Sequence, residues 1–111
     1  MYNFKILSCF KKQAKPLTKK FPNFKKDLLK FLNNLSLDNA INLGRGNYKL
    51  RLKLSDLPKG KNKSLRLIIH VIYQKNLIIP IAVYCKSEKE NISKLEINNN
   101  LLLAIEELKK I

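Results

Sequence analysis

The sequence predicts an α+β domain in which helices and a mainly antiparallel sheet come from separate parts of the chain. Two observations lead to this prediction. Apolar residues recur at intervals of three and four between about residues 10 and 35, which is the period of an amphipathic helix. Between residues 48 and 84 the pattern changes to alternation and then to nearly continuous apolar runs, which are typical of strands. Helices grouped apart from a three-strand meander favour the α+β class.

The N-terminal third is expected to hold one short strand and a helical hairpin. Within residues 2–7, apolar side chains alternate with polar ones, which is typical of a short strand. Pro16 and Pro22 cannot both lie inside one helix, because proline lacks an N–H group and clashes with the preceding turn. We therefore expect a helix over residues 8–14, a second short piece, and a longer helix over residues 23–35.

The middle of the chain is expected to form three strands. Residues 48–54 alternate strictly, which indicates a half-buried strand with a cationic exposed face. A basic loop over residues 56–64 leads to residues 65–73, whose continuous apolar run predicts a central strand. A turn then leads into residues 77–84, where Pro80 predicts an edge position or a bulge.

The C-terminal segment is expected to be helical. Ser93 and Glu96 have the spacing of a capping box, and apolar residues follow at helical intervals. The asparagines at 98–100 are poor helix formers and allow a break. The predicted order is β-α-α-β-β-β-α in a single domain over residues 1–111, with the helices on one face of a four-stranded sheet.

The charge balance indicates a polyanionic partner. The 111 residues include 23 Lys or Arg and 8 Asp or Glu, so the formal net charge is +15. Neutralising phosphates with such cations releases counterions and favours binding without any contact to a base. Cations are concentrated in two blocks, residues 1–30 and residues 45–66.

Several functional classes are excluded by composition. Cys9 and Cys85 lack the spacing of a zinc module and are too few for a disulfide framework, which favours the cytoplasm. The longest apolar run is far shorter than a bilayer span, and the N-terminus lacks the features of a signal peptide. No membrane association, metal or cofactor is therefore expected.

Phosphate contacts are expected on the strand over residues 48–54. Side chains on one face of a strand are about 6.6–6.8 Å apart, so Lys49, Arg51 and Lys53 form a row at roughly the spacing of nucleic-acid phosphates. Arg66 is the only charge in the next strand, and a guanidinium inside a sheet needs a carboxylate, water or a bound anion. A salt bridge to Glu88 or Glu90 is the alternative to an anion.

These residues also suggest a chemistry. If Lys49, Arg51 and Arg66 converge, they can stabilise a pentacoordinate phosphorane electrostatically. Lys49 is the candidate general base on a ribose 2′-hydroxyl, because crowded positive charges favour loss of a proton from a lysine. His70 lies about 13 Å along the strand from Arg66 and is expected in the core. Tyr84 either stacks on a base or is a core residue.

Four segments, in order along the chain, resemble those of a known family. They are Phe10–Pro22, Gly46–Arg51, Lys59–Ile68 and Val83–Ile92. Together they resemble the RelE/ParE superfamily of toxins from type II toxin–antitoxin systems, and within it the RelE/HigB-like branch. The resemblance covers about residues 4–97 and implies a small α+β domain with two N-terminal helices on an antiparallel sheet.

The resemblance also implies a function. RelE-type members cut mRNA in the ribosomal A site without a metal, which leaves a 2′,3′-cyclic phosphate and a 5′-hydroxyl and blocks translation. A cytoplasmic endoribonuclease with mRNA and the ribosome as partners is therefore expected, neutralised by a cognate antitoxin whose acidic segment wraps the basic surface. Two alternatives stay open: a ParE-like gyrase inhibitor, and a degenerate toxin that only binds antitoxin or nucleic acid.

Carried over by position, the resemblance assigns roles to named residues. The expected catalytic residues are Lys49, Arg51, Arg66 and Lys86. The expected contacts to RNA or the ribosome are Arg45, Lys53, Lys59, Lys61, Lys63 and Tyr84. This chain departs from the family at Lys63 and Ser64, where many relatives have two glycines, and at Ile92, where RelE has a catalytic tyrosine. No tyrosine is assigned to that role at this position, and Tyr84 is a candidate substitute.

Overall fold

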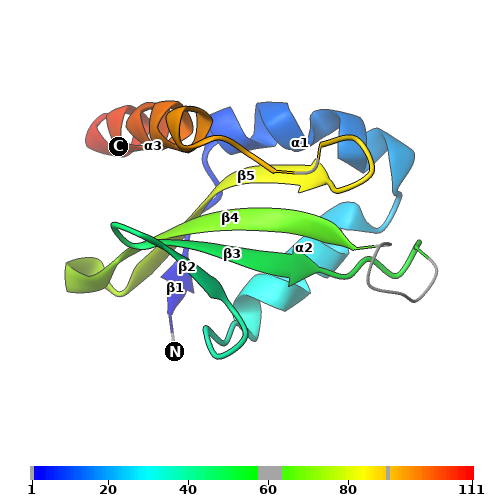
Figure 1. Cartoon of the computed structure of the whole chain (residues 1–111). Helices are drawn as coiled ribbons and strands as arrows, with labels where there is room; N and C mark the ends of the chain where they lie inside the picture. Colours follow the sequence, from blue (N-terminus) through cyan, green and yellow to red (C-terminus); the bar gives the residue numbers. More distant parts are fainter. Residues whose placement is uncertain (1, 58–63, 90) are drawn as a thin grey trace.

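Five strands form one sheet in the order β1-β5-β4-β3-β2, of which Figure 1 shows β5, β4, β3 and β2 from top to bottom. The structure is a computed structural model that describes residues 2–57, 64–89 and 91–111. The strands are β1 (Asn3–Phe4), β2 (Ile41–Gly44), β3 (Asn47–Leu52), β4 (Leu65–Ile72) and β5 (Leu77–Cys85). The short β1 is parallel to β5, and all other neighbours are antiparallel. The α+β class and the mainly antiparallel sheet are confirmed, but the sheet has five strands where four were predicted.

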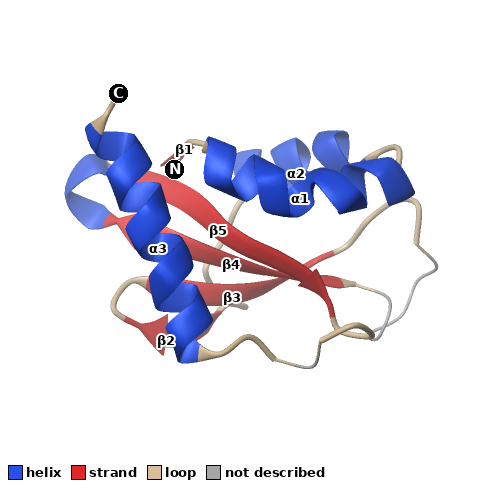
Figure 2. Cartoon of the chain, turned by 90° about the horizontal axis from the view of Figure 1, so that it is seen from above, coloured by secondary structure: helices blue, strands red, loops and turns tan. Residues whose placement is uncertain are grey.

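The helices lie on both faces of the sheet. They are α1 (Ser8–Lys20), α2 (Phe24–Asn33) and α3 (Lys94–Lys109), with a 3₁₀ turn, η2, over Tyr73–Lys75. The core between the sheet and the α1–α2 hairpin includes Phe10, Phe24 and Leu67. On the opposite face, Ile97 and Ala104 of α3 pack with Ile68 of β4, and α3 runs across the strands from its start near β2 (Figure 2). The prediction of helices on one face is therefore wrong for α3.

Helix α1 continues past the point where a break was predicted. Pro16 lies inside it and is exposed. A proline there removes one backbone hydrogen bond and crowds the turn before it, but Phe10, Ala14 and Leu17 are buried along one side of the helix. Their burial keeps the two predicted pieces in a single helix, and Pro22 lies in the connection to α2.

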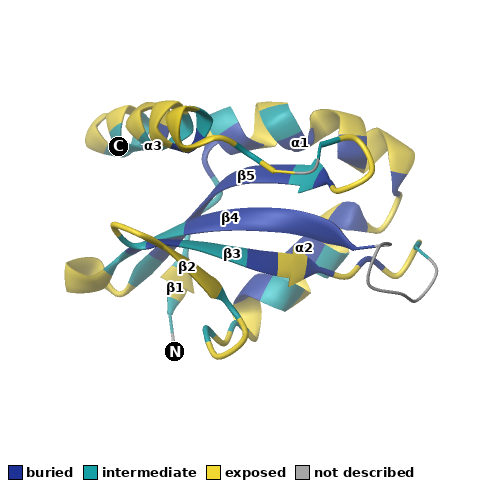
Figure 3. Ribbon diagram, viewed as in Figure 1, coloured by how far each residue is buried: buried dark blue, intermediate teal, exposed yellow. Residues whose placement is uncertain are grey.

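Strand β2 was not predicted, because its four residues are all exposed and show no alternation of burial (Figure 3). It pairs with β3 through a tight hairpin in which Gly44, Arg45 and Gly46 have φ angles of 89°, 56° and 81°. The first strand is also shorter than predicted, since only Asn3 and Phe4 pair with β5.

Pro80 lies at a bulge, as predicted. The register between β4 and β5 shifts between Ile68 and Ile69, and Ile69 faces Pro80. On the edge of β5 away from β4, no strand pairs beyond the two positions that β1 covers among the described residues. The side chain of Gln13 on α1 donates to the backbone oxygen of Ile81 at 3.2 Å, which satisfies one acceptor near the bulge.

Helix α3 begins at its predicted cap. The hydroxyl of Ser93 accepts a hydrogen bond from the backbone N–H of Glu96 at 3.1 Å. The helix passes unbroken through residues 98–100, because Ile97 and Ala104 on either side of them are buried against the sheet. Near its other end, Glu107 accepts bonds from the N–H of Ser8 at 2.7 Å, its hydroxyl at 2.5 Å and the N–H of Cys9 at 3.2 Å.

Glu107 therefore caps the N-terminus of α1, and we expect its loss to loosen α1 from α3. The hydroxyl and backbone N–H of Ser8 lower the pKa of Glu107 from its usual 4.5. A carboxylate with a lowered folded-state pKa stabilises the fold above its unfolded pKa, and this stability is lost as the pH falls through the folded pKa. Glu107→Gln should lower the thermal midpoint at pH 7. Below about pH 4.5 the thermal midpoint of the variant should decrease less with pH than that of the wild type. Circular dichroism melts between pH 3 and pH 7 test this. Glu106→Gln is the matched control, and equal behaviour of the two variants contradicts the role of Glu107.

Candidate nucleic-acid interface

One row of side chains crosses three strands on the sheet face that carries α3. Arg51 of β3 pairs in register with Arg66 of β4, and Arg66 pairs with Tyr84 of β5. Directly paired residues place their Cβ atoms about 4.5–5.5 Å apart on the same face of a sheet. The pairing thus places two arginines and a tyrosine that are distant in the sequence side by side on one face of the sheet.

Arg66 is held by a neutral partner. Its side chain is buried, with 7% exposed, and one guanidinium nitrogen donates to the hydroxyl of Ser64 at 2.8 Å. The alternative salt bridge to Glu88 is not formed, and Glu90 lies outside the described residues. Within residues 2–57, 64–89 and 91–111 the only ion pair joins Lys89 to Glu96.

Without a bound ligand, the adjacent positive charges of Arg51 and Arg66 destabilise the folded protein. Like charges directly opposite each other destabilise a sheet, and burial of a charge without a counter-charge adds to this cost. An anion placed between the two guanidinium groups removes both penalties. Arginine also presents a planar fork that fits two oxygens of a phosphate.

Tyr84 completes the row with a neutral donor. Its hydroxyl oxygen is buried and has no hydrogen-bond partner among the described residues. Burial raises the pKa of Tyr84 above its usual 10, while the positive charge of Arg66 and the nearby backbone of Ile92 act in the opposite direction. The phenol is therefore protonated at neutral pH and can donate to an oxygen of a ligand.

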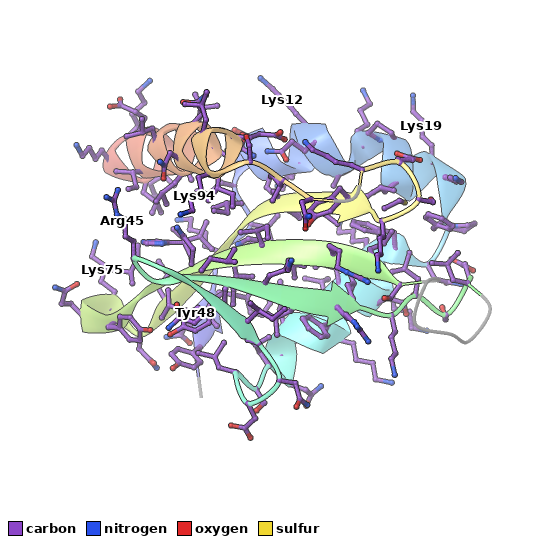
Figure 4. All side chains as sticks on the ribbon, viewed as in Figure 1. Lys12, Lys19, Arg45, Tyr48, Lys75 and Lys94 are labelled. Carbon is purple, nitrogen blue, oxygen red and sulfur yellow. The ribbon has the colours of Figure 1, made fainter. Side chains whose placement is uncertain are left out.

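Lys49 connects the row to a groove. It lies two positions before Arg51 on the same face of β3 and is half-buried. The groove has a volume of about 450 Å³ and lies between the β2–β3 hairpin and the start of α3. Three of its lining residues are cations, Arg45, Lys49 and Lys94. Arg45 and Lys94 lie on opposite sides of it, at the hairpin and at the start of α3 (Figure 4).

The other predicted residues lie around this row or outside the described part. Lys53 is exposed just beyond the end of β3, and Lys86 is exposed in the turn after β5. Cys85 pairs with Leu65, so Lys86 lies at the same end of the sheet as Arg66. The predicted binding residues Lys59, Lys61 and Lys63 lie outside the described residues.

His70 lies away from the row, at the other end of β4. It is half-buried, and its Nδ1 atom is 2.9 Å from the side-chain oxygen of Asn47 on β3. Burial lowers the pKa of His70 from 6.5, so the ring is neutral at pH 7. The expected core position holds only in part, because the ring is not fully enclosed.

Some residues of the site were not predicted from the sequence. Ser64 lies two positions before Arg66, just ahead of β4. Strand alternation continued back to residue 64 places it on the face of Arg66, and that spacing was a signal that it could hold the guanidinium. Lys94, Asn91 and Asn98 line the groove. They carried no local signal, because their place depends on how α3 crosses the sheet.

Neither a membrane-spanning helix nor a metal site is found among residues 2–57, 64–89 and 91–111. No helix there is long and apolar enough to cross a membrane. No group of three His, Cys, Asp or Glu side chains among the same residues is arranged to hold a metal ion.

The sheet order and the α1–α2 hairpin form a fold that is similar to that of the toxin RelE. The chain is similar to an arginine-to-alanine double mutant of the E. coli toxin RelE in the free state, with 20% identity and a TM-score of 0.54. The match covers 99% of this chain and 97% of the RelE chain. The toxin–antitoxin complex RelBE of E. coli matches with 21% identity and a TM-score of 0.50, over 77% of this chain and 96% of its own. A conserved hypothetical protein from Helicobacter pylori matches with 18% identity and a TM-score of 0.51, over 79% of this chain and 98% of its own. No protein-family model and no curated protein sequence matches the chain.

Proposed function

We propose that this protein is the toxin of a toxin–antitoxin pair and acts as a ribosome-dependent, metal-independent endoribonuclease on mRNA. The observation that carries the proposal is the pair of Arg51 and Arg66, placed in register beside Lys49 without a bonded carboxylate among the described residues. Such a pair is costly unless an anion binds it. On a RelE-like fold with a net charge of +15, RNA is the anion that fits best.

The proposed reaction is an attack within the RNA. The 2′-oxygen of one ribose forms a bond to the adjacent phosphorus, and the bond from phosphorus to the 5′-oxygen of the next nucleotide breaks. The products are a 2′,3′-cyclic phosphate and a 5′-hydroxyl. Lys49 removes the 2′-hydroxyl proton as general base, while Arg51 and Arg66 bind the non-bridging oxygens as their negative charge grows. Tyr84 donates its phenolic proton to the leaving 5′-oxygen, which becomes the 5′-hydroxyl.

The proposed partners follow from the same surface. The remaining predicted cations, with Lys86 and Lys53 near the row, contact the RNA backbone or the ribosome, and binding weakens steeply as salt is added. An antitoxin with an acidic segment covers this face and blocks it. The likeness to a chain of the solved E. coli RelBE toxin–antitoxin complex supports such a partner. The protein is expected to act in the cytoplasm, where mRNA and ribosomes are found.

Mapping new RNA ends on stalled ribosomes tests the proposal. Purified protein is added to ribosomes paused on a defined mRNA, and new 5′ ends are located by primer extension. Cuts inside the A-site codon that need the ribosome are the expected result. No cut by protein shown to be folded contradicts the nuclease, and a DNA-damage response without mRNA cleavage indicates a gyrase inhibitor instead.

Replacing Lys49 by alanine tests the general base. A positioned base contributes about 10²–10⁴-fold to the rate of a proton transfer, so we expect Lys49→Ala to slow cleavage at least about 10²-fold. The rate of cut formation on stalled ribosomes measures this. Lys75→Ala removes an exposed cation from η2, outside the row and groove, and should leave the rate unchanged. A Lys49→Ala rate within about threefold of wild type rules out the role.

A further inference from the structure

The groove beside the cation row differs from the row in its chemistry. Its walls combine aliphatic side chains, Ile92 and Ile97, with amide side chains of the segment before α3 and of α3 itself. Tyr84, with its unpartnered buried hydroxyl, belongs to both the row and the groove. A volume of about 450 Å³ is in the range of sites that enclose small organic ligands.

The amides of the groove are available to a ligand. The side chains of Asn91 and Asn98 are exposed and make no hydrogen bond among the described residues, whereas the side chain of Asn47 is already paired with His70. Each free amide offers two donors and one acceptor. The three cations of the groove can contact phosphates, whereas its aliphatic side chains suit the flat face of a heterocycle whose edge bonds to the amides.

The groove is also held in shape. The Ser93 cap fixes the first turn of α3 and so the positions of Ile97 and Asn98. An ion pair between Lys89 and Glu96 fastens the segment after β5 to the same turn. Side chains on a capped helix are positioned more precisely than those on a free loop. A site that distinguishes between similar ligands requires this precision.

We propose that this groove receives one nucleobase of the single-stranded substrate and that Asn91 and Asn98 determine the base preference. The choice of RNA rests on the proposed function, since Lys49 lines the groove and also adjoins the cation row. When a phosphate of the RNA lies between Arg51 and Arg66, a neighbouring base of the same RNA can pass Lys49 and enter the groove. The aliphatic side chains contact the face of that base, and the amides bond to its edge.

A binding experiment tests the groove without any cleavage. Isotope-labelled protein is titrated with trinucleotides that carry 2′-O-methyl groups and cannot be cut, with the central base present or absent. The base-containing trinucleotides should shift the side-chain amide signals of Asn91 and Asn98, and the abasic one should not. Equal shifts with both, or no shift of either amide, overturn the proposal and leave only a phosphate site.

Variants then separate this inference from the proposed function. Asn98→Ala and Asn91→Ala should reduce the ratio of cleavage between preferred and disfavoured bases by about tenfold. Asn99→Ala, an exposed asparagine of α3 outside the groove lining, should keep the wild-type ratio. Cleavage with unchanged ratios in all variants overturns the inference while the nuclease stands. If nothing is cleaved, the nuclease fails, and the trinucleotide titration still decides the groove.

Discussion

Replacing Arg66 by alanine is expected to slow ribosome-dependent mRNA cleavage by about 10²–10³-fold, the usual cost of removing one preorganised donor to a developing negative charge. Arg66 is the buried member of the row, bonded to Ser64 and paired with both Arg51 and Tyr84. Its guanidinium is therefore fixed before the substrate arrives. The rate of cut formation on stalled ribosomes is the measurement.

Two controls keep this prediction decisive. Arg66→Lys retains the positive charge and loses the planar fork, so its rate should fall between those of the wild type and the alanine variant. Lys12→Ala removes an exposed cation on α1, whose side chain points away from the sheet (Figure 4). It should cleave like the wild type. Folded Arg66→Ala protein that also cleaves at the wild-type rate contradicts the proposed site.

Replacing Phe10 by alanine is expected to destabilise the fold by about 3–5 kcal/mol, which is typical of removing a large buried aromatic side chain. Phe10 is 1% exposed and packs in the core between α1 and the sheet. The whole free energy of unfolding of a small domain is about 5–15 kcal/mol. Much of the stability should therefore be lost, and urea unfolding followed by circular dichroism measures it.

Leu102→Ala is the matched control for this loss. Leu102 lies on the outer side of α3 and is 63% exposed. Its removal should change the free energy of unfolding by no more than about 0.5 kcal/mol. Similar unfolding midpoints for Phe10→Ala and Leu102→Ala contradict the described core.

The local patterns of the sequence were sufficient for much of the fold. Helical spacing located α2 and α3, and the capping pair of Ser93 and Glu96 located the start of α3. Strict alternation in β3 placed Lys49 and Arg51 on one face, because the side-chain period of a strand is two. These features depend on neighbours in the chain, so they can be read locally.

Features that depend on distant contacts were not predictable in the same way. Helix α1 continues through Pro16 because the burial of Phe10, Ala14 and Leu17 outweighs the helix-breaking tendency of proline. Strand β2 is short and exposed, and only its pairing with β3 defines it. The register that sets Arg66 beside Arg51 and Tyr84 belongs to the assembled sheet, and so does the course of α3 that completes the groove.

The most direct test of the proposed chemistry asks whether the RNA supplies its own nucleophile at this face. A ribosome-bound mRNA is made with a single 2′-deoxynucleotide immediately before the mapped cleavage site, and its cleavage is compared with that of the all-ribose mRNA. The account predicts a 2′,3′-cyclic phosphate end from the ribose substrate and no cut at the deoxy position. Cleavage of the deoxy substrate at the ribose rate contradicts it.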